Sequence, residues 1–176
     1  MKTILLRPLL LICLVAITAS FNPPVEAIEW MSWEEAITKS KTDKNPKKIF
    51  VDVYTDWCGW CKRMDAVTFN NPEVAAYMKS NFYMVKLNAE QKQDIVYNNR
   101  TFKYVASGRR GYHELAAQLL KGKLSYPSVV FLDEKVKIVT VVPGFRQPNE
   151  FLKVANYVGE NIFKNTSWQE YSRSKK

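Results

Sequence analysis

The sequence has few of the residues that bind metal ions or cross-link a fold. Its 176 residues include one histidine, His113, and three cysteines. A structural zinc site takes about four cysteine or histidine ligands, and a scaffold of structural disulfides needs several cysteine pairs scattered along the chain. We therefore expect no metal site, no disulfide framework and no cofactor, and we expect His113 to lie on a helix surface or to be partly buried.

The sequence also lacks a long apolar run near its N-terminus. The apolar stretch 9–19 falls short of the roughly 20 residues that span a bilayer. It follows the positive charges of Lys2 and Arg7, and it precedes the small-residue site at 25–27. This order is typical of a cleaved secretory signal peptide.

We therefore expect residues 1–27 to be a signal peptide and residues 28–176 to form one exported domain of ordinary size. An uncleaved N-terminal anchor is the alternative interpretation. Bulky Ile12 before Cys13 argues against attachment of a lipid at that cysteine.

Acidic residues are in the minority. Without Lys2, Arg7 and Glu26, the chain keeps 24 Lys and Arg against 16 Asp and Glu, a net charge of +8. Such a balance is compatible with nucleic-acid binding, but the basic residues are spread along the chain and export argues against that partner. A solvated basic surface, or one that meets anionic envelope components, is the favoured interpretation. Arg109 and Arg110 could bind an anion, although a solvated loop explains them as well.

Signal cleavage would remove Cys13 and leave Cys58 and Cys61 as the only cysteines. A bridge across three positions removes little chain entropy from the unfolded state, so this pair would be a poor structural cross-link. It lies where an apolar run at 49–54 gives way to a helix-like run at 62–68. Two cysteines in this position are typical of a redox centre.

The remaining pattern alternates helices and strands. Ser32 and Glu35 form a capping box, and Asn71 followed by Pro72 marks a second helix start. We expect helices over residues 33–40, 62–68, 72–80, 113–120 and 148–163, with a further turn after Ser167. We expect strands over 49–54, 82–87, 128–132 and 135–142, and a hairpin of 95–97 with 101–104 around a polar turn.

Asp52 is the one acid within the apolar run 49–54. An isolated carboxylate is costly to bury in its charged form, so a buried Asp52 must be paired, hydrated or protonated. The alternative is an acid on an edge strand that faces solvent.

Motifs in a fixed order resemble those of thioredoxin-fold proteins. Val51-Asp52-Val53 precedes Trp57-Cys58-Gly59-Trp60-Cys61-Lys62, and Lys86-Leu87-Asn88 ends the next strand. Tyr126-Pro127-Ser128 and then Gly144 follow. The sequence is similar to exported bacterial thioredoxin-like thiol-disulfide oxidoreductases with a Trp-Cys-Gly-Trp-Cys active site.

The resemblance implies an α/β thioredoxin fold, with a central mixed sheet flanked by helices. Two departures accompany it. Trp60 stands where most thioredoxins have proline, and residues 91–111 are an insertion, which we expect to add a hairpin before the helix that precedes the cis-proline loop.

The resemblance also implies roles for single residues. Cys58 would attack a substrate disulfide and Cys61 would resolve the mixed disulfide, with Asp52 as general base and Lys86 tuning its charge. Pro127 would be cis and would present the Tyr126 backbone to an extended substrate. Trp57, Gly59 and Trp60 would form the substrate-facing rim, although simple packing is an equal explanation for Trp57.

The function implied is that of an exported enzyme, periplasmic or secreted in the bacterial envelope, that reduces or exchanges protein disulfides. Its partners would be protein disulfide substrates and an upstream dithiol electron donor. We expect a monomer with no nucleic-acid partner and no stable membrane insertion after signal cleavage. A net oxidant or isomerase is one alternative. A binding or assembly module, whose insertion contacts a partner and whose dithiol does not turn over, is another.

Overall fold

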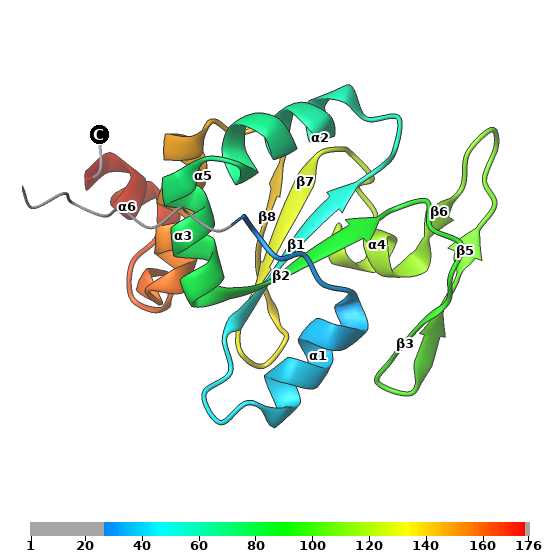
Figure 1. Ribbon diagram of the computed structural model, residues 1–176, viewed down its shortest axis with the longest axis horizontal. Coiled ribbons are helices and arrows are strands. Elements are labelled where there is room, and N and C mark those ends of the chain that lie inside the picture. The colour runs from blue at the N-terminus through cyan, green and yellow to red at the C-terminus, as the bar shows by residue number, and fades with distance from the viewer. Residues whose placement is uncertain (1–26, 175–176) are drawn as a thin grey trace, which may run out of the picture.

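A computed structural model describes residues 27–174, so the predicted signal peptide lies outside the described residues except for Ala27. Within that range the chain forms a four-stranded sheet with helices on both faces (Figure 1). The helices are α1 (Trp33–Thr42), α2 (Gly59–Met64), α3 (Pro72–Asn81), α4 (Glu114–Leu119), α5 (Pro148–Gly159) and α6 (Trp168–Ser174). The sheet consists of β1 (Lys48–Tyr54), β2 (Phe82–Asn88), β7 (Ser128–Leu132) and β8 (Ile138–Pro143).

The strand order is β2-β1-β7-β8. β1 runs parallel to β2, whereas β7 is antiparallel to both of its neighbours. This is the predicted mixed sheet, with parallel strands first and an antiparallel pair last. It confirms the thioredoxin fold class. Pro143 is tolerated because it ends β8, an edge strand.

Alternation along the strands divides the apolar side chains between two cores. On β1, Ile49, Val51 and Val53 join the core beneath α1 and α4. Phe50 points to the opposite face and packs in the second core with residues of α2, α3 and α5. Asp52 is two positions after Phe50, so it shares the face that α2 covers.

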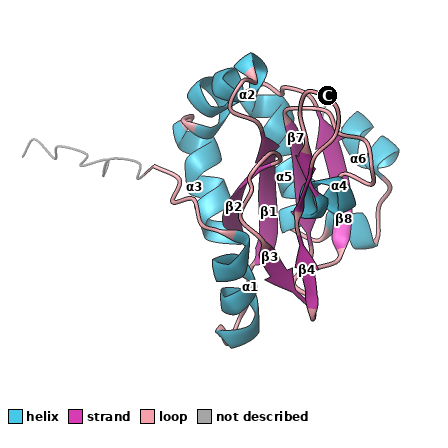
Figure 2. Cartoon of the chain, turned by 90° about the vertical axis from the view of Figure 1, so that its right-hand side faces the viewer, coloured by secondary structure: helices cyan, strands magenta, loops and turns pink. Residues whose placement is uncertain are grey.

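The insertion follows β2 and lies beside α4, and Figure 2 views the molecule from that side. Its hairpin of β3 (Ile95–Tyr97) and β4 (Arg100–Phe102) is confirmed. Asn98 and Asn99 both have positive φ, at 49° and 60°, as a tight two-residue hairpin turn requires. A second small pair, β5 (Tyr104–Val105) with β6 (Tyr112–His113), was not predicted because two-residue strands leave no readable alternation.

Several predicted boundaries were wrong for local reasons. The last long helix ends at Gly159 and not at residue 163, because Asn161 adopts a left-handed conformation with φ of 60°. β8 starts at Ile138 and not at residue 135, since the Asp133 carboxylate accepts hydrogen bonds from the backbone N–H of Lys135 and Lys137 and holds a wider turn.

His113 was predicted at a surface or partly buried position, and it is instead fully buried, at 0% exposure. It is the N-cap residue of α4, where its Nδ1 accepts a hydrogen bond from the Leu115 N–H at 3.3 Å. Its Nε2 lies 3.1 Å from the Gln93 carbonyl oxygen. The ring therefore ties the start of α4 to the insertion.

Candidate active site

Cys58 and Cys61 form a disulfide at the start of α2. Cys58 is the N-cap residue, and its sulfur accepts a hydrogen bond from the Cys61 N–H at 3.0 Å. A helix N-terminus carries partial positive charge and unpaired N–H groups, both of which stabilise a thiolate. Both residues are buried in this disulfide form, with Cys58 5% and Cys61 3% exposed.

The helix that carries the dithiol continues past Met64 through a π-helical turn, Asp65–Phe69, and ends at Asn70. The sequence predicted a helix over 62–68 and a second helix start at Asn71. The second start is where we expected it, but the first helix begins at Gly59. The extra turn places Cys58 at the N-cap of the helix and Cys61 within its first turn.

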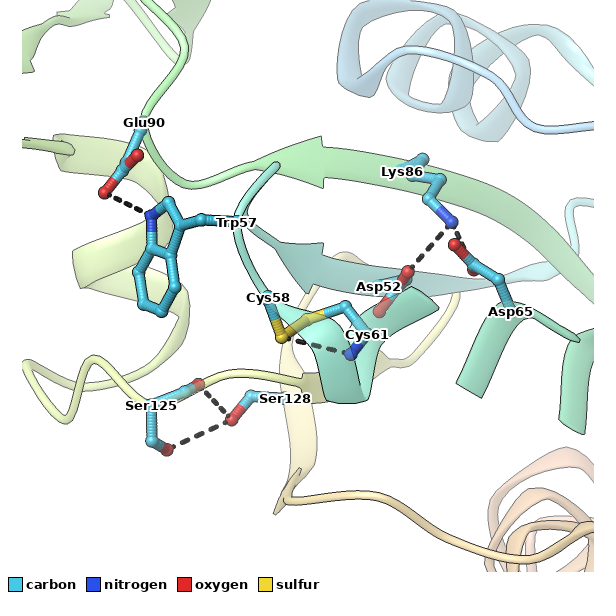
Figure 3. Close-up of a disulfide and its surroundings, with 9 residues drawn as sticks. All are labelled: Asp52, Trp57, Cys58, Cys61, Asp65, Lys86, Glu90, Ser125 and Ser128. Carbon is cyan, nitrogen blue, oxygen red and sulfur yellow. Dashed lines mark hydrogen bonds and ion pairs between the residues drawn. A yellow bond between two sulfur atoms is a disulfide. The ribbon is translucent and has the colours of Figure 1, made fainter. Parts of the chain in front are cut away.

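Asp52 is on a central strand and is 1% exposed, so the interpretation as a solvent-facing edge acid is wrong. Its register partner on β2 is Lys86, and the Lys86 amine lies 3.3 Å from the Asp52 carboxylate. In the view of Figure 3 the Asp52 carboxyl is drawn between Cys61 and Lys86. One carboxyl oxygen of Asp52 has no hydrogen-bond partner in the described part of the protein.

Asp65 is a second carboxylate at this site, and it was not predicted from the sequence. It forms an ion pair and hydrogen bond with Lys86, whose amine contacts both carboxylates (Figure 3). Lys86 also lies 4.7 Å from the centre of the Trp30 ring, a cation–π contact. The signal was available in the sequence, because Asp65 follows Cys58 by two helical turns and residues at that spacing share a helix face.

Burial raises the pKa of Asp52 from 3.8 to about 7, and this is the largest influence on it. The positive charge of Lys86 opposes the rise, while the negative charge of Asp65 adds to it. Because Lys86 is shared between two carboxylates, it stabilises charge on Asp52 less than an exclusive partner would. A carboxyl with a pKa near 7 can accept and release a proton at neutral pH.

The Tyr126–Pro127 peptide bond is cis, as the resemblance implied. The Ser128 hydroxyl donates to the Ser125 carbonyl at 2.7 Å, which closes the loop around the proline. On the other side, the Gly144 N–H donates to the Pro127 carbonyl at 2.7 Å. The loop is thus fixed at both ends, and Pro127 itself is buried.

Two tryptophans flank the dithiol and are largely exposed, Trp57 at 52% and Trp60 at 60%. Trp60 packs on Phe145, with ring centres 5.6 Å apart. Beside it is an open, mainly apolar hollow of about 300 Å³. The hollow is lined by Trp60, Tyr126, Pro127, Gly144 and Phe145.

Trp57 is held in place from three directions. Its indole N–H donates to the Glu90 carboxylate at 3.0 Å (Figure 3), and its ring meets that of Tyr126 edge to face at 6.1 Å. The Arg110 guanidinium lies 4.3 Å from the ring centre. Trp57 is therefore both packed and exposed. Arg110 is not merely a solvated loop residue, because it covers a ring next to the dithiol.

The structure thus brings together every predicted site residue. Asp52, Cys58, Cys61 and Lys86 lie at the carboxyl end of β1 and β2 with the start of α2. Gly59 is exposed between the cysteines, with no atom within 4 Å of where a side chain would start.

In residues 27–174 we find no cluster of three or more His, Cys, Asp or Glu side chains suited to a metal ion. No helix in the same range is long and apolar enough to cross a membrane.

Comparisons with known proteins place these features in context. Residues 21–150 match the family described as Thioredox_DsbH, a protein of unknown function (DUF255). Mouse spermatogenesis-associated protein 20 is 30% identical over 94 residues, which are 53% of this chain and 11% of that protein. The disulfide bond reductase DsbH of Chlamydia pneumoniae is 28% identical over 62% of this chain and 59% of its own length.

Among solved structures, one titled DsbH Oxidoreductase aligns with a TM-score of 0.56 and 21% identity, over 77% of this chain and 87% of that one. At this identity the likeness bears on the fold alone. The chain spans a small part of the mouse relative and under two thirds of the bacterial one.

Proposed function

The chain belongs to the Thioredox_DsbH family, and we propose that it is an exported thiol-disulfide oxidoreductase that reduces or exchanges disulfides in envelope proteins. The observation that carries the proposal is the Cys58–Cys61 disulfide at a helix start, close to a buried carboxyl whose pKa is about 7. The predicted signal peptide supports export, and the name of the Chlamydia relative supports the reducing direction.

The reaction begins with the reduced dithiol. The Cys58 thiolate attacks one sulfur of the substrate disulfide, the substrate S–S bond breaks, and the other substrate cysteine leaves as a thiolate. Cys58 is suited to this role because the Cys61 N–H that now points at its sulfur would stabilise its negative charge. The product of this step is a mixed disulfide between Cys58 and the substrate.

Cys61 completes the exchange. Its thiolate attacks the Cys58 sulfur, forms the Cys58–Cys61 disulfide and releases the second substrate thiolate, so two electrons pass from the protein to the substrate. Cys61 must first lose its proton, and we assign Asp52 as the group that accepts it. Burial raises the pKa of Asp52, the charge of Lys86 opposes that rise, and the charge of Asp65 adds to it.

The substrate-binding roles rest on the geometry of the rim. An extended segment could pair with the Tyr126 backbone, which the cis bond and the Ser125–Ser128 contact hold in place. The hollow beside Trp60 would accept an apolar side chain of that segment. An upstream dithiol donor would return electrons to the Cys58–Cys61 disulfide.

Insulin reduction by the purified protein tests the proposal. With dithiothreitol as electron source, the protein should accelerate precipitation of the insulin B chain, and the Cys58→Ser variant should have lost that activity. Equal rates with and without the protein would favour a binding or assembly module. The reduction potential against glutathione then separates a reductant from a net oxidant, since known proteins of this kind range from about −270 to about −120 mV.

A further inference from the structure

Residues at both ends of the insertion contact Trp57, at the rim of the active site. Glu90, just before the insertion, accepts a hydrogen bond from Trp57, and the guanidinium of Arg110, near its end, lies 4.3 Å from the centre of the Trp57 ring. These residues are about 20 positions apart in the chain. Their convergence on the residue before Cys58 makes the insertion part of the redox site and not a distant appendage.

The loop that contains Arg110 is fixed by paired strands and backbone hydrogen bonds. β5 and β6 pair on either side of it, and the Arg110 N–H donates to the Ser107 carbonyl at 3.2 Å. Gly111 is pressed against the paired strand, where an added Cβ would lie 2.3 Å from the Tyr104 ring and from the Val105 carbonyl. The buried His113 anchors the end of β6 through its N–H on the Ala89 carbonyl, at 2.6 Å.

Trp60, the second rim tryptophan, also has an arginine beside its ring. Arg63, on α2, lies 5.9 Å from the Trp60 ring centre and 5.8 Å from that of Phe145. The dithiol is therefore flanked by two arginine–aromatic pairs, one on each side. Both guanidinium groups belong to exposed residues, so they remain available to a partner.

The acidic groups near this rim are already engaged within the protein. Glu90 accepts from Trp57, and the Asp56 carboxylate accepts from the Asn88 amide at 3.0 Å. Arg63 and Arg110 form no ion pair within residues 27–174. The charged groups that contact the two rim tryptophans are two cations, Arg63 and Arg110, and one anion, Glu90, so the net charge at the rim is positive.

From this arrangement we propose that Arg110, held on Trp57 by the insertion, is a specificity-determining contact that favours protein disulfides flanked by acidic side chains. The occupant is an extended segment that places its disulfide at Cys58 and a carboxylate beside Arg110, with Arg63 able to take a second carboxylate. Planar guanidinium groups suit carboxylates because they can donate two parallel hydrogen bonds. This inference rests on the proposed function, since it names the substrates of the same dithiol.

The test uses two synthetic peptides with the same internal disulfide, one flanked by glutamates and one by lysines. For each peptide, the rate constant of reduction by the pre-reduced protein is measured by stopped flow at low salt. The wild-type protein should reduce the glutamate peptide about two- to fivefold faster, the range that an exposed charge contact gives. In Arg110→Gln that ratio should fall toward one, and Arg110→Lys should restore part of it.

Arg109→Gln is the matched control, because it removes the same charge from the neighbouring position, which has no ring or ion-pair contact in the described chain. Its peptide ratio should match that of the wild type. An equal fall in both variants would show that only the bulk charge matters and would overturn the proposal.

The two proposals fail differently in this assay. A wild-type ratio near one, with both peptides reduced, overturns the assignment of Arg110 and leaves the oxidoreductase function standing. Reduction of neither peptide, together with no insulin reduction, removes the proposed function and this inference with it.

Discussion

Replacement of Asp52 by Asn should make the protein more stable at alkaline pH, by an amount that the raised pKa of Asp52 sets. The folded protein holds the Asp52 proton up to about pH 7, whereas the ordinary value for the carboxyl is 3.8. Between these limits the folded state binds more protons than the unfolded state, so the free energy of unfolding falls as pH rises. Above about pH 7 the full cost of the buried charge is present.

The size of the effect follows from the same two values. A rise of the pKa from 3.8 to about 7 corresponds to about 4 kcal/mol, at about 1.4 kcal/mol for each pH unit. Asn has a similar shape and no charge to bury. Relative to wild type, Asp52→Asn should therefore gain about 4 kcal/mol between pH 4 and pH 8, and most of the gain should appear between pH 4 and pH 7.

Urea unfolding of the disulfide form, followed by tryptophan fluorescence at each pH, measures this difference. Two neighbouring variants sharpen the test. Lys86→Met removes the charge that lowers the pKa of Asp52, so the free energy of unfolding should continue to fall up to a higher pH than in wild type. Asp65→Asn removes the charge that raises this pKa, so the fall should end at lower pH. Stability curves for wild type and Asp52→Asn that run parallel from pH 4 to pH 8 would show that the pKa of Asp52 is not raised by folding.

The remaining predictions concern proton transfer and the insertion. Asp52→Asn should slow the decay of the mixed disulfide by about 10²-fold in quenched-flow experiments, because Cys61 would lose its proton acceptor; an unchanged decay would exclude that role. Burial lowers the pKa of His113 below its ordinary 6.5, so this group favours folding least at acidic pH. Protonation would also remove the acceptor for the Leu115 N–H. After division by the intrinsic exchange rate at each pH, amide exchange of residues 89–115 should thus be faster at pH 5 than at pH 7. His113→Asn keeps a capping acceptor that does not titrate, so it should remove this difference.

The sequence was sufficient where local chemistry and burial pattern agree. The capping box at Ser32 and the N-cap at Asn71 mark real helix starts, and the apolar runs correspond to the four sheet strands. Asp52 stood out because a charged residue interrupted an apolar run, and its register partner Lys86 was named from the resemblance.

What the sequence did not reveal depends on contacts between distant segments. The spacing of Asp65 from Cys58 indicates a shared helix face, but its ion pair with Lys86 forms only when the fold brings β2 beside that helix. Arg110 resembles a loop cation until the paired β5 and β6 strands carry it over Trp57. His113 was expected on a helix surface or partly buried, since nothing local indicates that its two ring nitrogens find partners in the interior.

The direct test of the central claim is the identity of the cysteine that attacks the substrate. Reduced Cys61→Ser and Cys58→Ser variants are each mixed with a peptide disulfide, quenched with acid and examined by intact-mass and peptide mass spectrometry. If Cys58 attacks, a stable mixed disulfide forms on Cys58 in the Cys61→Ser variant and almost none forms in the Cys58→Ser variant. An adduct that forms mainly on Cys61, or on neither cysteine, would contradict that claim.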